Sequence, residues 1–449
     1  MLGIIALLLL AALPAGSQEA PPEPARFLIE TITVEGPKEA AANIVRAETL
    51  LHPGESYTEN QLRLAVYRVH RLPFVLDASF ALRKGSRRGA YDLLIDVQPA
   101  LWFFYDLGAR AYRFGEPLRL DPHGFTSTDE RYSLAFTGLA GARLFVGRSG
   151  VLFGALDVEE GFQAGFTQYD LFHRGIVATA GFSTDVCCVR EVLPLGLDPR
   201  FVTWDFSNSR RLSLNLTVPL GGRQSLQVAA SERAGGAGPR QEILVEPNVH
   251  EGGFPEEGEL SYRRAEAKWV YDTSDDPAIP TRGSTLSAGL EASRFVAHGL
   301  GLEPLGPPFS ETTAPPFKSQ QVVAAVSAVR YWSITPRQTI SGMGRFAVGR
   351  SQVTNLLDGE NILPSIDLDY LGGSGRLQHS LVLQRSRGTT RVHDLLWETS
   401  AELGAERNTP AVGPTPLRRI ALETALVYRD QWGRVRISLD YLNLGKIVP

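Results

Sequence analysis

Residues 258–295 read GELSYRRAEAKWVYDTSDDPAIPTRGSTLSAGLEASRF and contain two stretches in which apolar and polar side chains alternate. In residues 264–271 the alanine and aromatic residues at odd positions alternate with charged residues at 264, 266 and 268. In residues 284–295 leucine and alanine alternate with polar residues. A period of two places successive side chains on opposite faces of a β-strand. The segment between the stretches is rich in turn-forming residues and breaks both patterns. This part of the chain therefore predicts two strands, each with an apolar and a polar face, joined by a turn.

Two classes of protein contain strands of this kind. A strand of roughly 10 residues with one apolar face, one polar face and an aromatic residue near its end suits the wall of a transmembrane barrel. A soluble β-sandwich shows the same alternation, because one face of each sheet packs on the core and the other meets water. The number of such strands and the destination of the chain distinguish the two classes.

Short alternating segments follow one another through residues 99–449. The 44 glycines and 29 prolines occur in short clusters between them, which favours an all-β architecture. Because single-chain bacterial barrels have even numbers of strands, the pattern predicts an antiparallel transmembrane β-barrel of about 16 strands. The candidate strands lie at 101–112, 131–139, 143–156, 161–169, 175–184, 201–206, 212–218, 225–231, 242–245, 259–271, 284–295, 320–332, 339–348, 377–384, 395–403, 420–428 and 434–443.

The N-terminus predicts export. Residues 4–13 form an apolar run that is too short to cross a bilayer as a helix, which needs roughly 20 residues. Small residues at Ala15 and Ser17 follow this run, so we interpret residues 1–17 as a secretory signal peptide. A net charge of −4 argues against a nucleic-acid partner.

The only cysteines, Cys187 and Cys188, are adjacent in the sequence. Their Cα atoms lie about 3.8 Å apart, which is closer than disulfide geometry prefers. The sequence therefore predicts no disulfide framework, and we interpret the pair as lying in a loop or at a strand end without a role. The alternative is a vicinal metal or redox site.

Residues 26–98 predict a small α+β domain with the order β-α-α-β-β. Alternation over 26–35 indicates the first strand, and residues 38–48 have helical character. Thr58 and Gln61 form a capping box at the start of a second helix, which ends before Pro73.

This order, together with Gly36, Pro53-Gly54, Tyr57-Thr58 and Leu72-Pro73-Phe74, resembles a POTRA domain. The resemblance implies a periplasmic module that captures unfolded client strands by adding them to the edge of its sheet. The alternative is a small α+β domain with an unrelated role.

A signal peptide, a POTRA-like domain and a terminal barrel together resemble the BamA/TamA-type outer-membrane assembly family, also called the bacterial surface antigen family. One local motif adds to this resemblance. The turn between the two opening strands is similar to the family's acidic loop, which ends in Pro-Thr-x-Gly. The corresponding residues are Asp272, Asp275, Asp276, Pro280 and Gly283.

A second motif, LGGSGR at 371–376, resembles the glycine-rich start of the family's long inward-folded loop. The family's Arg-Gly-aromatic tip is absent, and Glu402-Leu403-Gly404 stands in for the usual Asp-x-Gly on a neighbouring strand. The resemblance implies that Arg376 pairs with Glu402 inside the lumen, in a charge-assisted bond. The alternative is an ordinary external turn. The residues of this hypothesis are Gly372, Gly373, Ser374, Gly375 and Arg376, with Glu402 and Gly404 as partners.

No pattern for catalysis, cofactor binding or metal binding stands out in the sequence. The acidic loop lacks the glycine and distal glutamate of a helical calcium loop, and the eight histidines lack ligand spacing. No Gly-x-Ser-x-Gly motif is present. We therefore predict a protein that is not an enzyme and has no cofactor.

The leading hypothesis is an outer-membrane protein, with its POTRA-like domain in the periplasm, that assists insertion or translocation of β-rich clients. Its expected partners are the bilayer, unfolded client polypeptides and periplasmic accessory proteins. The first and last barrel strands are expected to form a seam that opens. A passive channel or structural surface protein is the alternative, and a lipid-active hydrolase is a third class for which the sequence offers no nucleophile–base pair.

Overall fold

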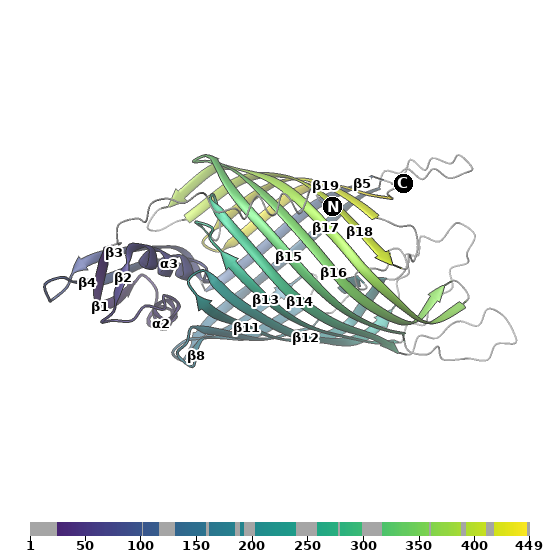
Figure 1. The fold of residues 1–449 in the computed structure, drawn as a ribbon, viewed down its shortest axis with the longest axis horizontal. Helices are drawn as coiled ribbons and strands as arrows, with labels where there is room; N and C mark the ends of the chain where they lie inside the picture. The colour runs from purple at the N-terminus through teal and green to yellow at the C-terminus, as the bar shows by residue number, and fades with distance from the viewer. Residues whose placement is uncertain are drawn as a thin grey trace.

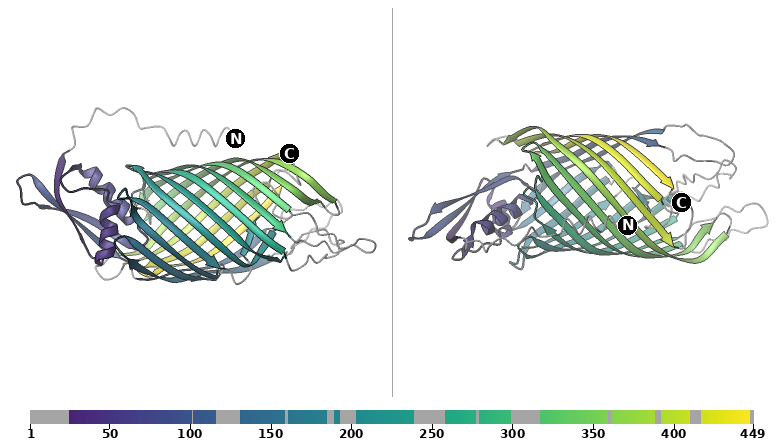
Figure 2. Two further views of the ribbon diagram at one scale, coloured as in Figure 1. Left: turned by 90° about the horizontal axis from the view of Figure 1, so that it is seen from below. Right: turned by 45° about the horizontal axis from the view of Figure 1, so that its top comes forward.

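The computed structural model describes residues 25–100, 102–115, 131–158, 161–184, 189–192, 203–238, 258–276, 279–298, 317–358, 361–387, 392–409 and 417–446. The predicted signal peptide (1–17), the pair Cys187 and Cys188, and the candidate strand at 242–245 lie outside these residues. Figure 1 shows a small domain at one end of a barrel, and the two further views in Figure 2 show the same arrangement.

The small domain combines four strands with two helices. Its elements are β1 (Arg26–Glu35), α2 (Glu39–Glu48), β2 (Ser56–Thr58), α3 (Glu59–His70), β3 (Val75–Lys84) and β4 (Ala90–Pro99). The sheet order is β2-β1-β4-β3, with β1 parallel to β4. The predicted capping box forms at the start of α3: the Thr58 hydroxyl accepts from the Gln61 N–H, and the Gln61 side chain accepts from the Thr58 N–H. Strand β2 has only three residues and is not among the elements predicted from the sequence.

The barrel strands follow in chain order. Their bounds are β5 (Phe103–Gly115), β6 (Arg131–Val146), β7 (Gly150–Asp157), β8 (Gly161–Leu171), β9 (Ile176–Thr184), β10 (Val189–Val192), β11 (Thr203–Gly221), β12 (Gln224–Gly238), β13 (Gly258–Asp272), β14 (Gly283–His298), β15 (Phe317–Thr335), β16 (Gln338–Asp358), β17 (Asn361–Arg387), β18 (Val392–Thr409), β19 (Leu417–Asp430) and β20 (Gly433–Lys446).

These strands form one sheet of 16 that closes on itself, which confirms the predicted fold class. Strand β10 pairs with β11 alone, beyond the end of β9, so the closed ring in the described part of the chain has 15 strands. An odd ring makes its first and last strands run in the same direction, and β20 pairs with β5 in parallel. The predicted segments 201–206 and 212–218 belong to a single strand, β11, interrupted by an irregularity between Ser207 and Arg210.

The exterior of the ring is apolar. On β15, Val322, Val326 and Trp332 are exposed by 56%, 42% and 46%, whereas the alternate positions, such as Gln321 and Ser327, face the interior. Exposed tyrosine and tryptophan side chains gather on the outer face near the small domain, among them Tyr271, Trp332, Trp397 and Tyr428. An apolar exterior with an aromatic girdle at its edge fits a wall that lies in lipid.

Candidate functional site: the barrel seam and the domain junction

The seam between β5 and β20 differs from every other strand pair of the ring as described. Its register runs in parallel from Gly433 opposite Tyr105 to Asn443 opposite Gly115, whereas the other neighbouring pairs are antiparallel. Parallel pairing is slightly less stable per residue, because its hydrogen bonds are slanted. The first and last barrel strands, which were predicted to form the seam, are therefore hydrogen-bonded to each other. Their pairing is weaker per residue than that of an antiparallel pair.

Two ion pairs cross the seam. Arg434 and Asp106 are register partners, and the guanidinium donates from Nε and Nη2 to the two carboxylate oxygens at 3.1 and 2.7 Å. Nε of Arg110 on β5 lies 3.0 Å from Oδ2 of Asp440 on β20. Because the side chains of Arg434 and Asp106 are about half exposed, we expect this pair to contribute at most about 1 kcal/mol to the stability of the seam.

The end of the seam nearest the small domain is fastened by the turn between β19 and β20. The Tyr105 hydroxyl donates to Asp430 Oδ2 at 3.1 Å, and the Tyr105 N–H donates to the Trp432 carbonyl at 3.0 Å. At Gly433 a Cβ atom would lie 1.8 Å from the Tyr105 carbonyl oxygen, so only glycine permits this close approach.

A chain of charges on the inner face leads from β17 to the seam. Arg436 on β20 donates to Glu398 Oε2 at 2.6 Å and also to Glu423 Oε1. Arg376 on β17 donates to the second oxygen of Glu423 at 2.8 Å. Glu423 thus lies between two arginines, and its side chain is only 14% exposed.

The prediction that residues 372–376 begin an inward-folded loop is wrong. Residues 372–376 lie inside β17 and pair with β16 on one side and β18 on the other, so they form neither a loop nor an external turn. At Gly372 the absence of a side chain has a packing reason, because a Cβ there would lie 2.1 Å from the Tyr370 hydroxyl. Ser374 is opposite Gly404 in the register.

The predicted partner of Arg376 is also wrong. Glu402 is the register partner of Arg376, yet the guanidinium binds Glu423 on the next strand instead. A long, flexible arginine can cross a neighbouring strand, and Glu423 offers a carboxylate already shared with Arg436. The sequence does not reveal this diagonal choice, although the alternation of β19 places Glu423 on the inner face.

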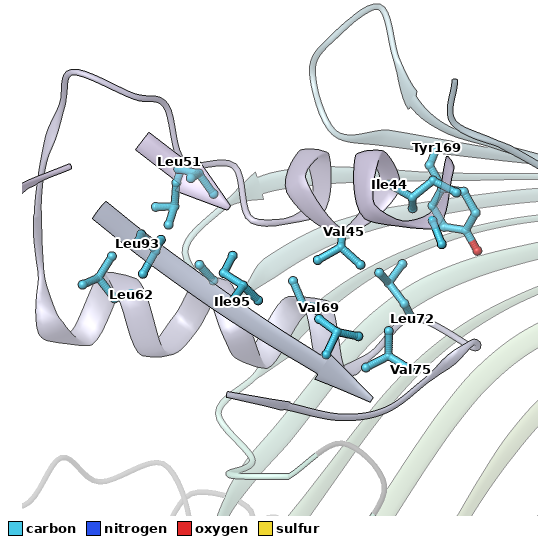
Figure 3. Packing of buried hydrophobic residues seen from close by; sticks show 14 of the residues in the cluster. Ile44, Val45, Leu51, Leu62, Val69, Leu72, Val75, Leu93, Ile95 and Tyr169 are labelled. Carbon is cyan, nitrogen blue, oxygen red and sulfur yellow. The ribbon is translucent and has the colours of Figure 1, made fainter. Parts of the chain in front are cut away.

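The small domain packs directly on the barrel wall at β6, β7 and β8. The Phe74 ring makes edge contacts with Phe145 and Tyr169, with centroids 5.0 and 6.0 Å apart. Tyr169 belongs to the same buried cluster as Ile44 of α2, as Figure 3 shows. Arg143 on β6 donates to the Pro73 carbonyl at 2.6 Å. The domain therefore shares its hydrophobic core with the barrel.

The predicted acidic loop makes the polar part of this junction. Asp272 Oδ2 accepts a hydrogen bond of 2.9 Å from the Tyr67 hydroxyl of α3, which also lies 2.7 Å from Ser274 Oγ. Arg71 approaches the same carboxylate at 3.8 Å. Burial, assisted by the nearby Asp272 charge, raises the pKa of Tyr67 to about 12, so this hydroxyl stays protonated as a donor.

Removing the Tyr67 hydroxyl is expected to loosen the junction. In Tyr67→Phe, Asp272 loses a donor, which costs about 1–2 kcal/mol at a partly buried carboxylate. Amide hydrogen exchange in residues 273–282 should speed up relative to the wild type. Tyr91→Phe is the control, because Tyr91 offers its ring to Phe27 and makes no hydrogen bond at the junction. Equal exchange in the two variants would contradict this role.

The remaining acids of the loop hold its own backbone. Asp275 accepts from the Thr281 and Arg282 N–H groups at 2.8 and 2.9 Å and from the Thr281 hydroxyl, while Asp276 accepts from Ile279 N–H at 3.1 Å. Pro280 lies inside this turn. Gly283 has a φ of +101°, and a Cβ there would lie 2.3 Å from the Thr273 carbonyl oxygen. The loop is thus a folded turn.

We expect this turn to weaken in acid. Burial acts to raise the pKa of Asp275, but the Thr281 and Arg282 hydrogen bonds outweigh it and lower the pKa below the ordinary 3.8. A lowered folded-state pKa stabilises the turn fully above about pH 3.8, and this contribution is lost as the pH falls through the folded-state pKa. Exchange protection of residues 273–282, corrected for the intrinsic rate, should fall over this range. In Asp275→Asn the exchange protection of these residues should be lower at pH 7 and should not fall further as the pH is lowered. If this variant shows the same pH dependence as the wild type, Asp275 is not the group that weakens the turn in acid.

Within the described ranges, no group of three or more histidine, cysteine, aspartate or glutamate side chains is placed to hold a metal ion. A search of the same residues finds no helix with the length and hydropathy to cross a bilayer.

The closed ring, its apolar exterior and its polar interior define the class of the protein: a transmembrane β-barrel of the outer-membrane type, with a small α+β domain at one end. No family model and no curated protein matches the sequence. Solved structures do match its fold. BamA from Haemophilus ducreyi lacking POTRA domains 1–3 is 9% identical, with 90% of this chain and 80% of that chain covered at a TM-score of 0.39.

CdiB from Acinetobacter baumannii is 10% identical, with 90% of this chain and 70% of that chain covered at a TM-score of 0.39. A chain of the FpvAI–pyocin S2 complex is 9% identical, with 76% of this chain and 59% of that chain covered at a TM-score of 0.28. BamA is thus among the proteins that this chain resembles, in line with the resemblance predicted from the sequence. At these values the similarity concerns the course of the chain alone, and the functional proposal rests on contacts within this molecule.

Proposed function

We propose that this protein assists the insertion or translocation of β-rich client polypeptides at the outer membrane, without enzymatic chemistry and without a cofactor. The observation that carries the proposal is the seam: β5 and β20 form the one parallel pair of the ring among the described strands. This pair is the point at which the ring separates with the smallest loss of pairing per residue.

An open seam would offer a template to a client. Unpaired N–H and C=O groups are costly in lipid, so the free edges of β5 and β20 would pair with an incoming strand. The client then gains hydrogen bonds and buries apolar side chains against lipid, and this gain drives insertion. Closure of the ring behind the client restores the pairing that the structure shows.

The small domain provides a first contact for the client. Among the strands that the structure describes, β3 is at the end of its sheet and pairs only with β4, so one edge of residues 75–84 is open to a further strand. Adding an extended peptide to such an edge is a known mode of recognition. The junction at Phe74 and Tyr67 would hold this edge beneath the barrel, on the periplasmic side, where accessory proteins can also bind.

The test of the proposal is insertion of an unfolded barrel client into proteoliposomes that contain the full chain, with β5 and β20 free or joined by a disulfide. Insertion that depends on a free seam supports the proposal. Insertion that proceeds equally with the joined seam contradicts it.

The seam is completely paired from Gly433 to Asn443, and the small domain packs on the wall, which favours a second candidate function. In this alternative the barrel is a passive channel or structural surface protein, and the small domain is a plug or tether. A stable open pore in single-channel recordings, combined with client insertion no faster than in empty liposomes, would support this alternative.

A further inference from the structure

A row of polar residues crosses the outer face of the barrel at the end away from the small domain. Its members are successive register partners on β12 to β17, and those on β13 to β15 are central. All are exposed, and each shares its face with the apolar exterior of its strand. In order around the ring they are Glu232, Arg263, Arg294, Gln320, Gln352 and Asp367, with Arg350 beside the last two.

The charges of this row are not balanced at its centre. Arg263 donates to Glu232 at 2.9 and 2.7 Å, and Arg350 donates to Asp367 at 3.0 Å. Arg294 faces no carboxylate in the described part of the chain and lies directly opposite Arg263. Like charges at directly opposite positions destabilise a sheet. An anion held between Arg263 and Arg294 would remove this repulsion.

The surroundings of Arg294 identify the kind of anion. A hollow of about 1040 Å³ is lined by Arg263, Arg294 and Arg350, and most of its residues have outward-facing side chains. Apolar residues of the same hollow, including Leu212 and Val322, continue onto the apolar wall below. Glu232 and Asp367 also line this open hollow, so its outer rim has three arginines against two carboxylates, a net charge of +1, above an apolar slope.

The position of the row matches a membrane surface. The exposed tyrosine and tryptophan residues lie at the edge of the apolar wall near the small domain, and the row lies toward the opposite edge. Arginine on a lipid-facing wall is strongly unfavourable at the bilayer midplane but nearly neutral close to the membrane interface. The row is thus at the height of lipid headgroups, in the leaflet on the side away from the small domain.

We propose that Arg263 and Arg294 bind the phosphate group of a phosphorylated lipid in that leaflet, with its acyl chains along the apolar wall. Arginine suits this role because its planar guanidinium binds phosphate through paired hydrogen bonds. This site requires only that the barrel lies in a membrane and is independent of any client.

Binding of lipid A, a diphosphorylated glycolipid, to the full chain in detergent micelles tests the proposal, with native mass spectrometry as the readout. We expect wild-type protein to bind lipid A at least about tenfold more tightly than its dephosphorylated form, since charge-assisted hydrogen bonds to phosphate are the strong ones. Arg294→Gln should lose this preference, and Arg294→Lys, which keeps the charge, should retain part of it.

Lys268→Gln is the matched control, because Lys268 is a cation on the same strand as Arg263 but on its inner face. Its lipid binding should equal that of the wild type. Equal binding of phosphorylated and dephosphorylated lipid by the wild type, or full phosphate preference in Arg294→Gln, would overturn the proposal. Competition by inorganic phosphate at the concentration of the lipid would also overturn it, because the site would then be one for free phosphate.

Discussion

A disulfide between β5 and β20 is expected to slow client insertion strongly. Ala109 and Ile437 are register partners across the seam, and neighbouring strands lie about 4.8 Å apart, within the Cα range of disulfides. In Ala109→Cys/Ile437→Cys, made with Cys187 and Cys188 replaced by serine, oxidation joins the two strands covalently. The rate at which a urea-unfolded client inserts into proteoliposomes can be monitored by the heat-modifiable electrophoretic mobility of the folded client. This rate should fall at least about tenfold, which corresponds to an increase in the activation barrier of ~1.4 kcal/mol or more.

The matched control moves the crosslink by one strand. Ile437 also faces Leu426 of β19, so Leu426→Cys/Ile437→Cys joins β20 to its hairpin partner and leaves the seam free. Insertion should be unchanged by oxidation in this variant, and reductant should restore the first variant. If insertion continues at the wild-type rate with the β5–β20 disulfide formed, the seam is not the entry point for clients, and the passive-barrel alternative gains support.

The fold was predictable from the sequence because alternation is a local signal. The segment 434–443 places Val435, Ile437 and Leu439 on one face by its period alone, and the structure exposes Ile437 and Leu439 on the outer wall. Closure is not a local signal. The merging of 201–206 with 212–218, the short β10 and the resulting odd ring depend on pairings between distant strands, which the sequence pattern does not encode.

The candidate site shows the same division. The acidic loop was recognisable because Asp275 and Gly283 serve the turn itself, through nearby backbone groups. Contacts with distant elements were not, because neither Tyr67 on Asp272 nor Glu423 on Arg376 follows from spacing along the chain. The glycine-rich segment misled the prediction, since glycine fits a turn and also fits a strand crowded by Tyr370.

Neutralising Glu423 is expected to destabilise the barrel, because two arginines on the inner face share its carboxylate. In Glu423→Gln the guanidinium groups of Arg436 and Arg376 lose a shared carboxylate and repel each other across β18 and β19. Breaking a fully buried ion pair costs about 3–5 kcal/mol, and because the two arginine side chains are 23% and 29% exposed we expect about 1–3 kcal/mol. Urea unfolding in detergent micelles or liposomes, read by tryptophan fluorescence, should show this as a lower midpoint with an unchanged slope.

Glu402→Gln provides the comparison, because Glu402 is directly opposite Arg376 in the register but makes no ion pair with it. The free energy of unfolding of this variant should differ from that of the wild type by less than about 0.5 kcal/mol, as for substitutions that remove no specific contact. A double variant, Glu423→Gln/Arg376→Gln, should recover part of the loss, since one of the uncompensated charges is then absent. Equal shifts for the two glutamates would mean that the register partner, and not the diagonal one, balances Arg376, and the chain of charges leading to the seam would have to be redrawn.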